Sequence, residues 1–322
     1  MAEEKKAAAQ AAPPIDLHAY PGSVDIMNYP TEAGYQEYLY DWEEFKIMAR
    51  STFKSQMGGK VPSREEVRKA QASGAFMAGH PTPEALLKTM DEAAFEYVCL
   101  CDVKMWSYYY HHKIIMDYGV DSIYELVKNS KGRLIGAASY NPFRIDESLR
   151  DIEKAVKKYG FKYVYMHPIT FGLSFADAKL YPLYAKCSEL GIPVGMQVGH
   201  SAEVLPSWCG HPYEVDKVAI DFPNLKINMS HTGYPWVDEW CSVIFRQPNV
   251  YGDISAYNPS NLTQDIVSFF NSSRGREKTM FGSNTYGLKL TKGQFLALPL
   301  KEETKKRVLG LNAREFLGLN KK

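Results

Sequence analysis

The chain of 322 residues is 45% hydrophobic and 23% charged, so it is long enough for one large α/β barrel or two ordinary domains and too apolar to be disordered. Its formal net charge of +1 argues against a nucleic-acid-binding surface and against a polybasic membrane patch. The five cysteines are scattered, and only Cys99 and Cys101 are close together. This pattern predicts reduced thiols in a cytoplasmic protein rather than a zinc site or a disulfide framework.

The first 14 residues, MAEEKKAAAQAAPP, are charged, rich in alanine and end in two prolines. They lack the apolar core of a signal peptide, and no apolar run elsewhere approaches the ~20 residues that span a bilayer. We therefore expect a disordered tail at 1–14, followed by a single domain over 15–320 with no membrane partner.

The first predicted strand covers 15–20, IDLHAY, where alternation places Asp16, His18 and Tyr20 on one face. Residues 21–81 show no strand pattern and combine aromatic segments, a basic stretch and glycine, serine and proline breaks. We interpret 21–81 as a helical insertion over the mouth of a barrel, and ordinary packing of a long surface loop is an equally good interpretation.

Regular alternation of helices and strands begins at Thr82, where a hydroxyl N-cap, Pro83 and Glu84 form a strong helix start. Seven further strands are predicted at 97–103, 134–141, 163–167, 193–198, 226–231, 250–255 and 279–283. The helices are predicted at about 82–94, 108–129, 145–159, 180–190, 213–221, 236–246, 261–271 and 302–317. Eight strands separated by helices imply a parallel sheet, and the absence of G-x-G-x-x-G after the first strand disfavours an open doubly wound sheet. The sequence thus predicts an α/β fold, a closed (β/α)₈ TIM barrel with a helical insertion after strand one.

Polar residues gather where these strands end, and the carboxyl ends of barrel strands converge on one site. The residues predicted at this rim are His18, Tyr20, Asp102, Asn141, His167, Gln197, His200, His231, Asp253 and Asn284. Four of the eight histidines are among them. A water-exposed position explains Asp102 and Asn141 equally well, but it explains the four histidines poorly.

His231 is the first candidate for chemistry because it stands where a short apolar strand gives way to a helix at Thr232 and Gly233. The unperturbed pKa of imidazole lies near neutrality, which suits general acid–base work. The alternative interpretation is a core histidine whose ring is satisfied by a backbone carbonyl.

A set of segments carries a family resemblance: IDLHAY (15–20), GRLIGAASYNPF (132–143), GFKYVYMHP (160–168), LGIPVGMQVGH (190–200), NLKINMSHTGYPWVDE (224–239) and MFGSN (280–284). Together they resemble the amidohydrolase-related barrel family that includes aminocarboxymuconate-semialdehyde and resorcylate decarboxylases as well as lactone hydrolases. The resemblance runs from residue 15 to residue 319 and implies the same barrel.

The resemblance also implies a divalent metal held by H-x-H on strand one, a histidine ending strand five and an aspartate ending strand eight. Here His18 matches the first position, while Tyr20, Gln197 and Asn284 stand where the other ligands would be. Because neutral amide oxygens are weak ligands for zinc or manganese, we expect no cofactor, or at most a weakened Zn or Mn site. If a metal binds, the ligands expected are His18, Asp16 and His231.

We expect a metal-independent lyase that decarboxylates a small aromatic or cyclic acid without oxidation. The predicted catalytic residues are His231, as general acid/base, with His18 and Asp16. The predicted substrate-binding residues are Tyr20, His167, Gln197, His200, Trp236, Asp253 and Asn284. Two alternatives stay open: a hydrolase of a lactone, ester or amide, and a catalytically inactive barrel that binds a ligand. We further expect a small-molecule substrate, a cytoplasmic location and a homodimer or higher homo-oligomer.

Overall fold

A computed structural model describes residues 15–30, 42–48, 50, 54, 59–60, 63, 65–66, 69, 80, 82–110, 112–284 and 286–319. The tail predicted at 1–14 and most of the insertion predicted at 21–81 lie outside these residues. Within the range of that insertion the structure describes one short helix, α2 (Glu43–Met48).

Eight parallel strands form one sheet in the order β1-β2-β5-β6-β7-β8-β9-β10. Their bounds are β1 (Ser23–Asn28), β2 (Phe95–Cys101), β5 (Leu134–Ala138), β6 (Tyr163–Met166), β7 (Val194–Gln197), β8 (Ile227–Ser230), β9 (Val250–Asp253) and β10 (Thr279–Met280). Most strand residues are buried on both faces, as expected where helices cover the outside and side chains fill the inside. The predicted (β/α)₈ barrel is confirmed.

The ring of strands closes between the two ends of the chain. The amide of Ile26 in β1 donates to the carbonyl of Phe281, just beyond β10, over 3.0 Å. Beside this bond, the fully buried carboxylate of Asp25 accepts from the amide of Ser283 at 2.9 Å and from its hydroxyl. The first and last barrel strands are therefore joined by backbone and side-chain bonds alike.

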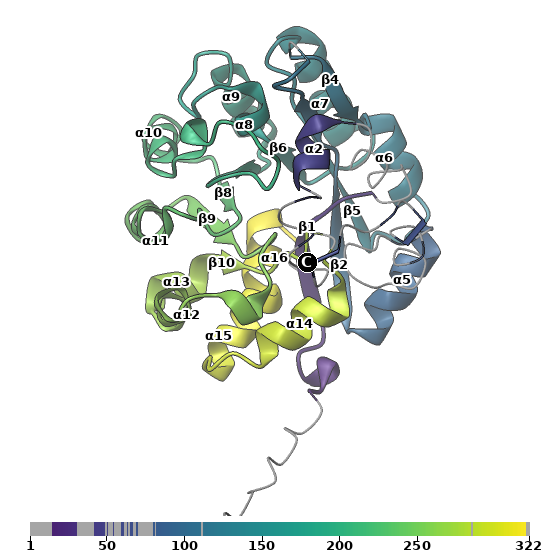
Figure 1. Ribbon diagram of the computed structural model, residues 1–322, viewed down its shortest axis with the longest axis vertical. Helices are drawn as coiled ribbons and strands as arrows, with labels where there is room; N and C mark the ends of the chain where they lie inside the picture. The colour runs from purple at the N-terminus through teal and green to yellow at the C-terminus, as the bar shows by residue number, and fades with distance from the viewer. Residues whose placement is uncertain are drawn as a thin grey trace, which may run out of the picture.

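Helices surround the strands, and the C-terminal helix lies beside β1 and β10 (Figure 1). They are α5 (Pro83–Glu92), α6 (Val120–Val127), α7 (Ile145–Lys157), α8 (Pro168–Phe171), α9 (Tyr181–Leu190), α10 (Tyr213–Asp221), α11 (Val237–Arg246), α12 (Gln264–Asn271), α13 (Ser273–Lys278), α14 (Leu288–Leu296), α15 (Glu302–Lys306) and α16 (Asn312–Leu317). The start predicted for α5 is confirmed, because the Thr82 hydroxyl accepts from the amide of Ala85. None of the helices in the described ranges is long and apolar enough to cross a membrane.

Strand one was predicted in the wrong place. Residues 15–20 are largely exposed and contain a short 3₁₀ turn, Leu17–Ala19, with the Asp16 carboxylate accepting from the amide of His18 at 2.8 Å. The barrel strand is instead β1, whose six residues are all buried. The alternation in 15–20 is typical of a strand with one face exposed to solvent. A barrel strand is instead buried on both faces, by helices outside and by side chains inside. β1 thus occupies the beginning of the range predicted as an insertion.

A helix predicted at 108–129 is also wrong over its first half. The structure has an antiparallel hairpin there, formed by β3 (Lys104–Trp106) and β4 (Ile114–Asp117), and the helix α6 begins only at Val120. Bulky aromatic and β-branched side chains favour a strand over a helix, so local propensity agrees with the hairpin.

Lys292 gives a prediction about stability at alkaline pH. Its fully buried ammonium donates to the carbonyls of Tyr20 at 3.0 Å and Ala93 at 2.8 Å, and burial lowers its pKa to about 8. The folded protein therefore holds this proton less tightly than the unfolded chain, so its stabilising contribution is lost as the pH falls through about 8. We compare the free energy of unfolding of the wild type with that of Lys292→Met. The wild-type value minus the variant value is expected to rise between about pH 8 and pH 10, by at most about 1.4 kcal/mol per pH unit. Urea titrations across this range measure it, and a constant difference would contradict the prediction.

Candidate functional site

The candidate site lies at the carboxyl ends of neighbouring barrel strands. His167 directly follows β6, Gln197 ends β7, His231 follows β8 and Asp253 ends β9. All four side chains are buried, and His231 is close enough to His167 that a proton on its ring would lower the pKa of His167. The structure therefore brings together four of the residues predicted from the sequence.

The backbone of His231 has a φ of 72°, in the left-handed region that residues other than glycine seldom adopt. Such a conformation costs about 1–3 kcal/mol and persists only where surrounding contacts impose it. One such contact is the backbone amide of His231, which donates to a carboxylate oxygen of Asp253 over 3.0 Å. The end of β8 is thus fixed by the end of β9.

The His231 ring is oriented by a residue that sequence reasoning missed. Its Nδ1 lies 2.7 Å from the hydroxyl oxygen of Ser255, and that hydroxyl in turn donates to Asp253. Burial lowers the pKa of His231 to about 4, although the nearby Asp253 carboxylate opposes this shift. The imidazole is consequently neutral at physiological pH.

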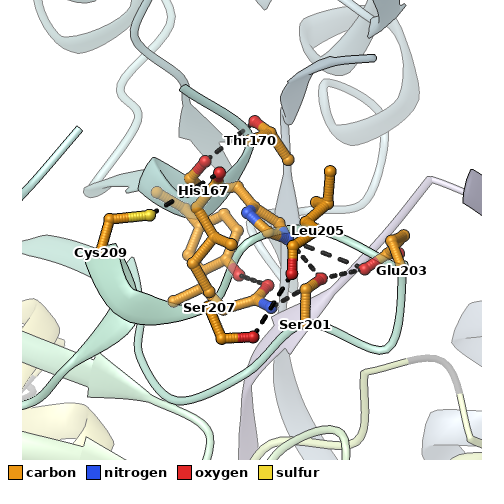
Figure 2. A network of polar contacts seen from close by, with 10 residues as sticks. His167, Thr170, Ser201, Glu203, Leu205, Ser207 and Cys209 are labelled. Atoms are coloured by element: carbon orange, nitrogen blue, oxygen red, sulfur yellow. Dashed lines mark hydrogen bonds and ion pairs between the residues drawn. The ribbon is translucent and has the colours of Figure 1, made fainter. Parts of the chain in front are cut away.

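A second polar cluster surrounds His167 (Figure 2). Nε2 of His167 and the amide nitrogen of Gln197 each lie 3.3 Å from the hydroxyl oxygen of Ser201, which donates to Glu203. Burial lowers the pKa of His167 to about 3, so this ring is neutral too. Its Nδ1 is buried and has no hydrogen-bond partner within the described part of the chain.

Two carboxylic acids lie in or near this cluster. Burial raises the pKa of Glu203, and the charge of Glu44 in α2 raises it further. Glu44 is itself buried and accepts from the hydroxyl of Ser107, at the end of β3. A helix from the range predicted as the insertion therefore contributes charge next to the strand-end residues. Ser201, Glu203 and Ser255 were not predicted as site residues, because each lies beyond the end of its strand, where the spacing of polar residues does not show which side chains meet.

Three residues predicted for the site lie elsewhere. Asp16, His18 and Tyr20 precede β1, so they lie at the opposite end of the barrel from His231. The Tyr20 hydroxyl bonds to Glu302, and Asp16 and His18 are exposed. Placing them at the site was wrong because it followed from the wrong strand one.

The remaining predicted residues lie around the strand ends. His200 donates its amide to the carbonyl of Tyr234 at 2.8 Å, and burial lowers its pKa. Trp236 packs against the ring of His211, with 4.9 Å between centroids. Asn284, beyond β10, donates its amide to Met27 at 2.9 Å.

Asp102 and Asn141 differ in their surroundings. Asp102 is fully buried, pairs with Lys104 at 3.6 Å and accepts from the amide of Gly119, so it is not the water-exposed strand tip considered from the sequence. Asn141 accepts from the amide of Phe143 at 2.9 Å and shapes a turn. Both residues act in local structure.

The side chains that the structure describes do not form a site for a divalent metal. Within the described ranges, no group of three or more histidine, cysteine, aspartate or glutamate side chains is arranged to hold an ion. At the end of β1 the residues are Met27, Asn28 and Tyr29, and the oxygens of Asp25 are already occupied by four donors. Zinc and manganese require several imidazole or carboxylate ligands, which this set lacks.

Comparison with known proteins agrees with this architecture. A family model described as "Amidohydrolase" matches residues 115–319. A curated relative, 2-amino-3-carboxymuconate-6-semialdehyde decarboxylase of Dictyostelium discoideum, is 23% identical over 236 residues, covering 62% of this chain and 65% of the relative. The match thus spans less than two thirds of that relative.

Two solved structures resemble the whole barrel. An uncharacterized TIM-barrel protein from Bordetella bronchiseptica has a TM-score of 0.70 and 24% identity, with 92% of this chain and 98% of that chain covered. A dihydroxybenzoic acid decarboxylase from Polaromonas sp. JS666, with bound manganese and the inhibitor 2-nitroresorcinol, has a TM-score of 0.61 and 16% identity, with 94% and 98% covered. At these identities the likeness shows the fold.

Proposed function

This chain belongs to the amidohydrolase family, and from that premise we propose that it is a carbon–carbon lyase that decarboxylates a small aromatic or cyclic acid without oxidation. The observation that carries the proposal is the buried, neutral imidazole of His231, oriented by Ser255 and Asp253 at the carboxyl end of β8. The chemistry named for the curated relative and for the manganese-bound decarboxylase supports the reaction class.

Non-oxidative decarboxylation replaces a carboxylate on carbon by a proton. The residue that delivers this proton must first accept one, and the unprotonated nitrogen of a neutral imidazole can accept a proton and later return it. His231 is the proposed proton carrier. Gln197, His167, His200, Trp236 and Asn284 are proposed to orient the substrate by hydrogen bonds and packing, and Asp253 to hold His231 in place. A single barrel domain over 15–320, a cytoplasmic location and a homo-oligomer remain part of this proposal.

A chelation experiment tests whether the reaction depends on a metal. Because the described donor set does not fit a divalent ion, we expect protein dialysed against EDTA to keep its decarboxylase activity and to contain substoichiometric Zn and Mn by elemental analysis. Loss of activity on chelation, with recovery on adding manganese, would contradict a metal-independent site.

A barrel that binds a ligand without turning it over is the second candidate, favoured by the lack of a fitting metal-ligand set among the described side chains. A panel of hydroxybenzoates and lactones, tested for turnover and for binding with wild-type protein and His231→Ala, separates the candidates. Loss of carbon dioxide from one hydroxybenzoate supports the lyase, and hydrolysis of a lactone supports a hydrolase. Tight binding of one compound without any turnover supports the binding barrel.

A further inference from the structure

The hydroxyl of Ser255 lies at the centre of three polar contacts, and their geometry limits where protons can be. Its oxygen is close to a carboxylate oxygen of Asp253, 2.7 Å from Nδ1 of His231 and 3.3 Å from the hydroxyl of Ser230. A serine hydroxyl has one proton to donate and two lone pairs to accept with. Only one of the three neighbours can therefore receive the Ser255 proton.

Asp253 is the neighbour that must receive it. Its carboxylate also accepts from the amides of His231 at 3.0 Å and Ser255 at 2.9 Å, and from the side-chain amide of Asn228 at 2.6 Å. A carboxylate surrounded by donors in this way is the ionised form, which can only accept. The close contact between two oxygens then requires a proton between them, and the Ser255 hydroxyl supplies it.

The remaining contacts follow from this assignment. Since the Ser255 proton points to Asp253, Nδ1 of His231 must carry a hydrogen and donate it to Ser255. Nε2 of the neutral ring then holds a lone pair, since the hydrogen-bond contact of the ring with Ser255 is made by Nδ1. We infer that Ser255 is a positioning residue that, together with Asp253, fixes His231 as the Nδ1–H tautomer and presents Nε2 as a proton acceptor.

This assignment deepens the proposed function and rests on it for its chemical consequence. A ring that is neutral and unprotonated at Nε2 must first receive a proton, so the ligand must bring one, from a carboxylic acid or a phenol. With a carboxylic acid, the O–H bond breaks as Nε2 takes the proton, and the carbon–carbon bond breaks as carbon dioxide leaves. The electron pair left on carbon then takes the proton back from Nε2. The sum is R–COOH giving R–H and CO₂, with no oxidant or external acid.

The tautomer is measurable without any substrate, by long-range ¹H–¹⁵N correlation of histidine side chains in ¹⁵N-labelled full-length protein at pH 7. The His231 signals are identified by their loss in His231→Gln. We expect the pattern of an Nδ1–H ring in the wild type. In Ser255→Ala the acceptor at Nδ1 is gone, and we expect the Nε2–H form to become the major species.

Two control variants separate a positioning role from general damage. Ser255→Thr keeps the hydroxyl, and Ser230→Ala removes the neighbour that contacts Ser255 but not the His231 ring, so both should keep the Nδ1–H pattern. An Nε2–H or doubly protonated His231 in the wild type would overturn the inference, even if Ser255→Ala fails to fold. An unchanged pattern in folded Ser255→Ala would also overturn it. A confirmed tautomer without decarboxylation of any tested acid would instead count against the proposed function alone.

Discussion

Replacing His231 with asparagine is expected to lower kcat/KM for the decarboxylated acid by about 10²–10⁴-fold, the range that general acid–base groups contribute. The expectation follows from the buried imidazole, which is neutral because its pKa is lowered to about 4 and is held by Ser255 and Asp253. Asparagine can preserve some hydrogen bonding but cannot carry a proton between substrate atoms. Steady-state assays of carbon dioxide release measure the effect.

His18→Asn is the matched control, since it makes the same substitution at an exposed histidine beyond the other end of the barrel. We expect it to keep wild-type kcat/KM. If His18→Asn were as damaging as His231→Asn, the site would lie where the sequence pattern first suggested. If His231→Asn retained full activity, another group would be the proton carrier.

Gly195→Ala is expected to produce the largest loss of stability, about 3 kcal/mol in the free energy of unfolding, because the core has no room for a methyl group there. A Cβ at Gly195, in β7, would stand 1.7 Å from the hydroxyl oxygen of Tyr163, which is fully buried in β6. That hydroxyl accepts from Asn228 at 3.0 Å, and Asn228 also donates to Asp253. The clash therefore reaches the residue that holds His231, and activity should fall with stability.

Urea denaturation of three variants tests this packing argument. Gly293→Ala, in the helix α14, places its Cβ no closer than 3.9 Å to another atom and is expected to gain about 0.5–1 kcal/mol from reduced backbone entropy. The double variant Gly195→Ala with Tyr163→Phe removes the atom that clashes most and should recover part of the loss. An unfolding free energy of Gly195→Ala equal to that of the wild type would contradict the expected clash.

The strands and most of the helices from β5 onwards were predictable because each barrel strand is a short apolar run between helical patterns. The helices α8, α13 and α14 were not predicted. The predicted helix 213–221 agrees with α10, and 145–159 is within two residues of α7. Strand one was not predictable as a half-exposed alternating strand, since all six residues of β1 are buried, including the polar Ser23, Asp25 and Asn28. The exposed segment 15–20 has the polar–apolar alternation expected of a strand. The first strand was therefore assigned to this segment instead of to β1.

The candidate site was predictable only where a residue directly ends a strand. His231, His167 and Gln197 do so, and topology alone then gathers them. Ser255 contacts the His231 ring across 24 positions of sequence, and nothing in the spacing of polar residues marks it out. Such partners depend on how loops turn after their strands, which local patterns do not encode.

The bonds between Asp25 and Ser283 also fix an order of events during synthesis. These two residues are 258 positions apart, so β1 leaves the ribosome long before the segment that completes it. The entropy cost of such a long closure grows only logarithmically with length, so the delay is kinetic rather than a serious loss of stability. Until β10 has been synthesised, β1 and β9 each have an unpaired edge. A nascent chain stopped before residue 279 would expose both edges to pairing with other chains.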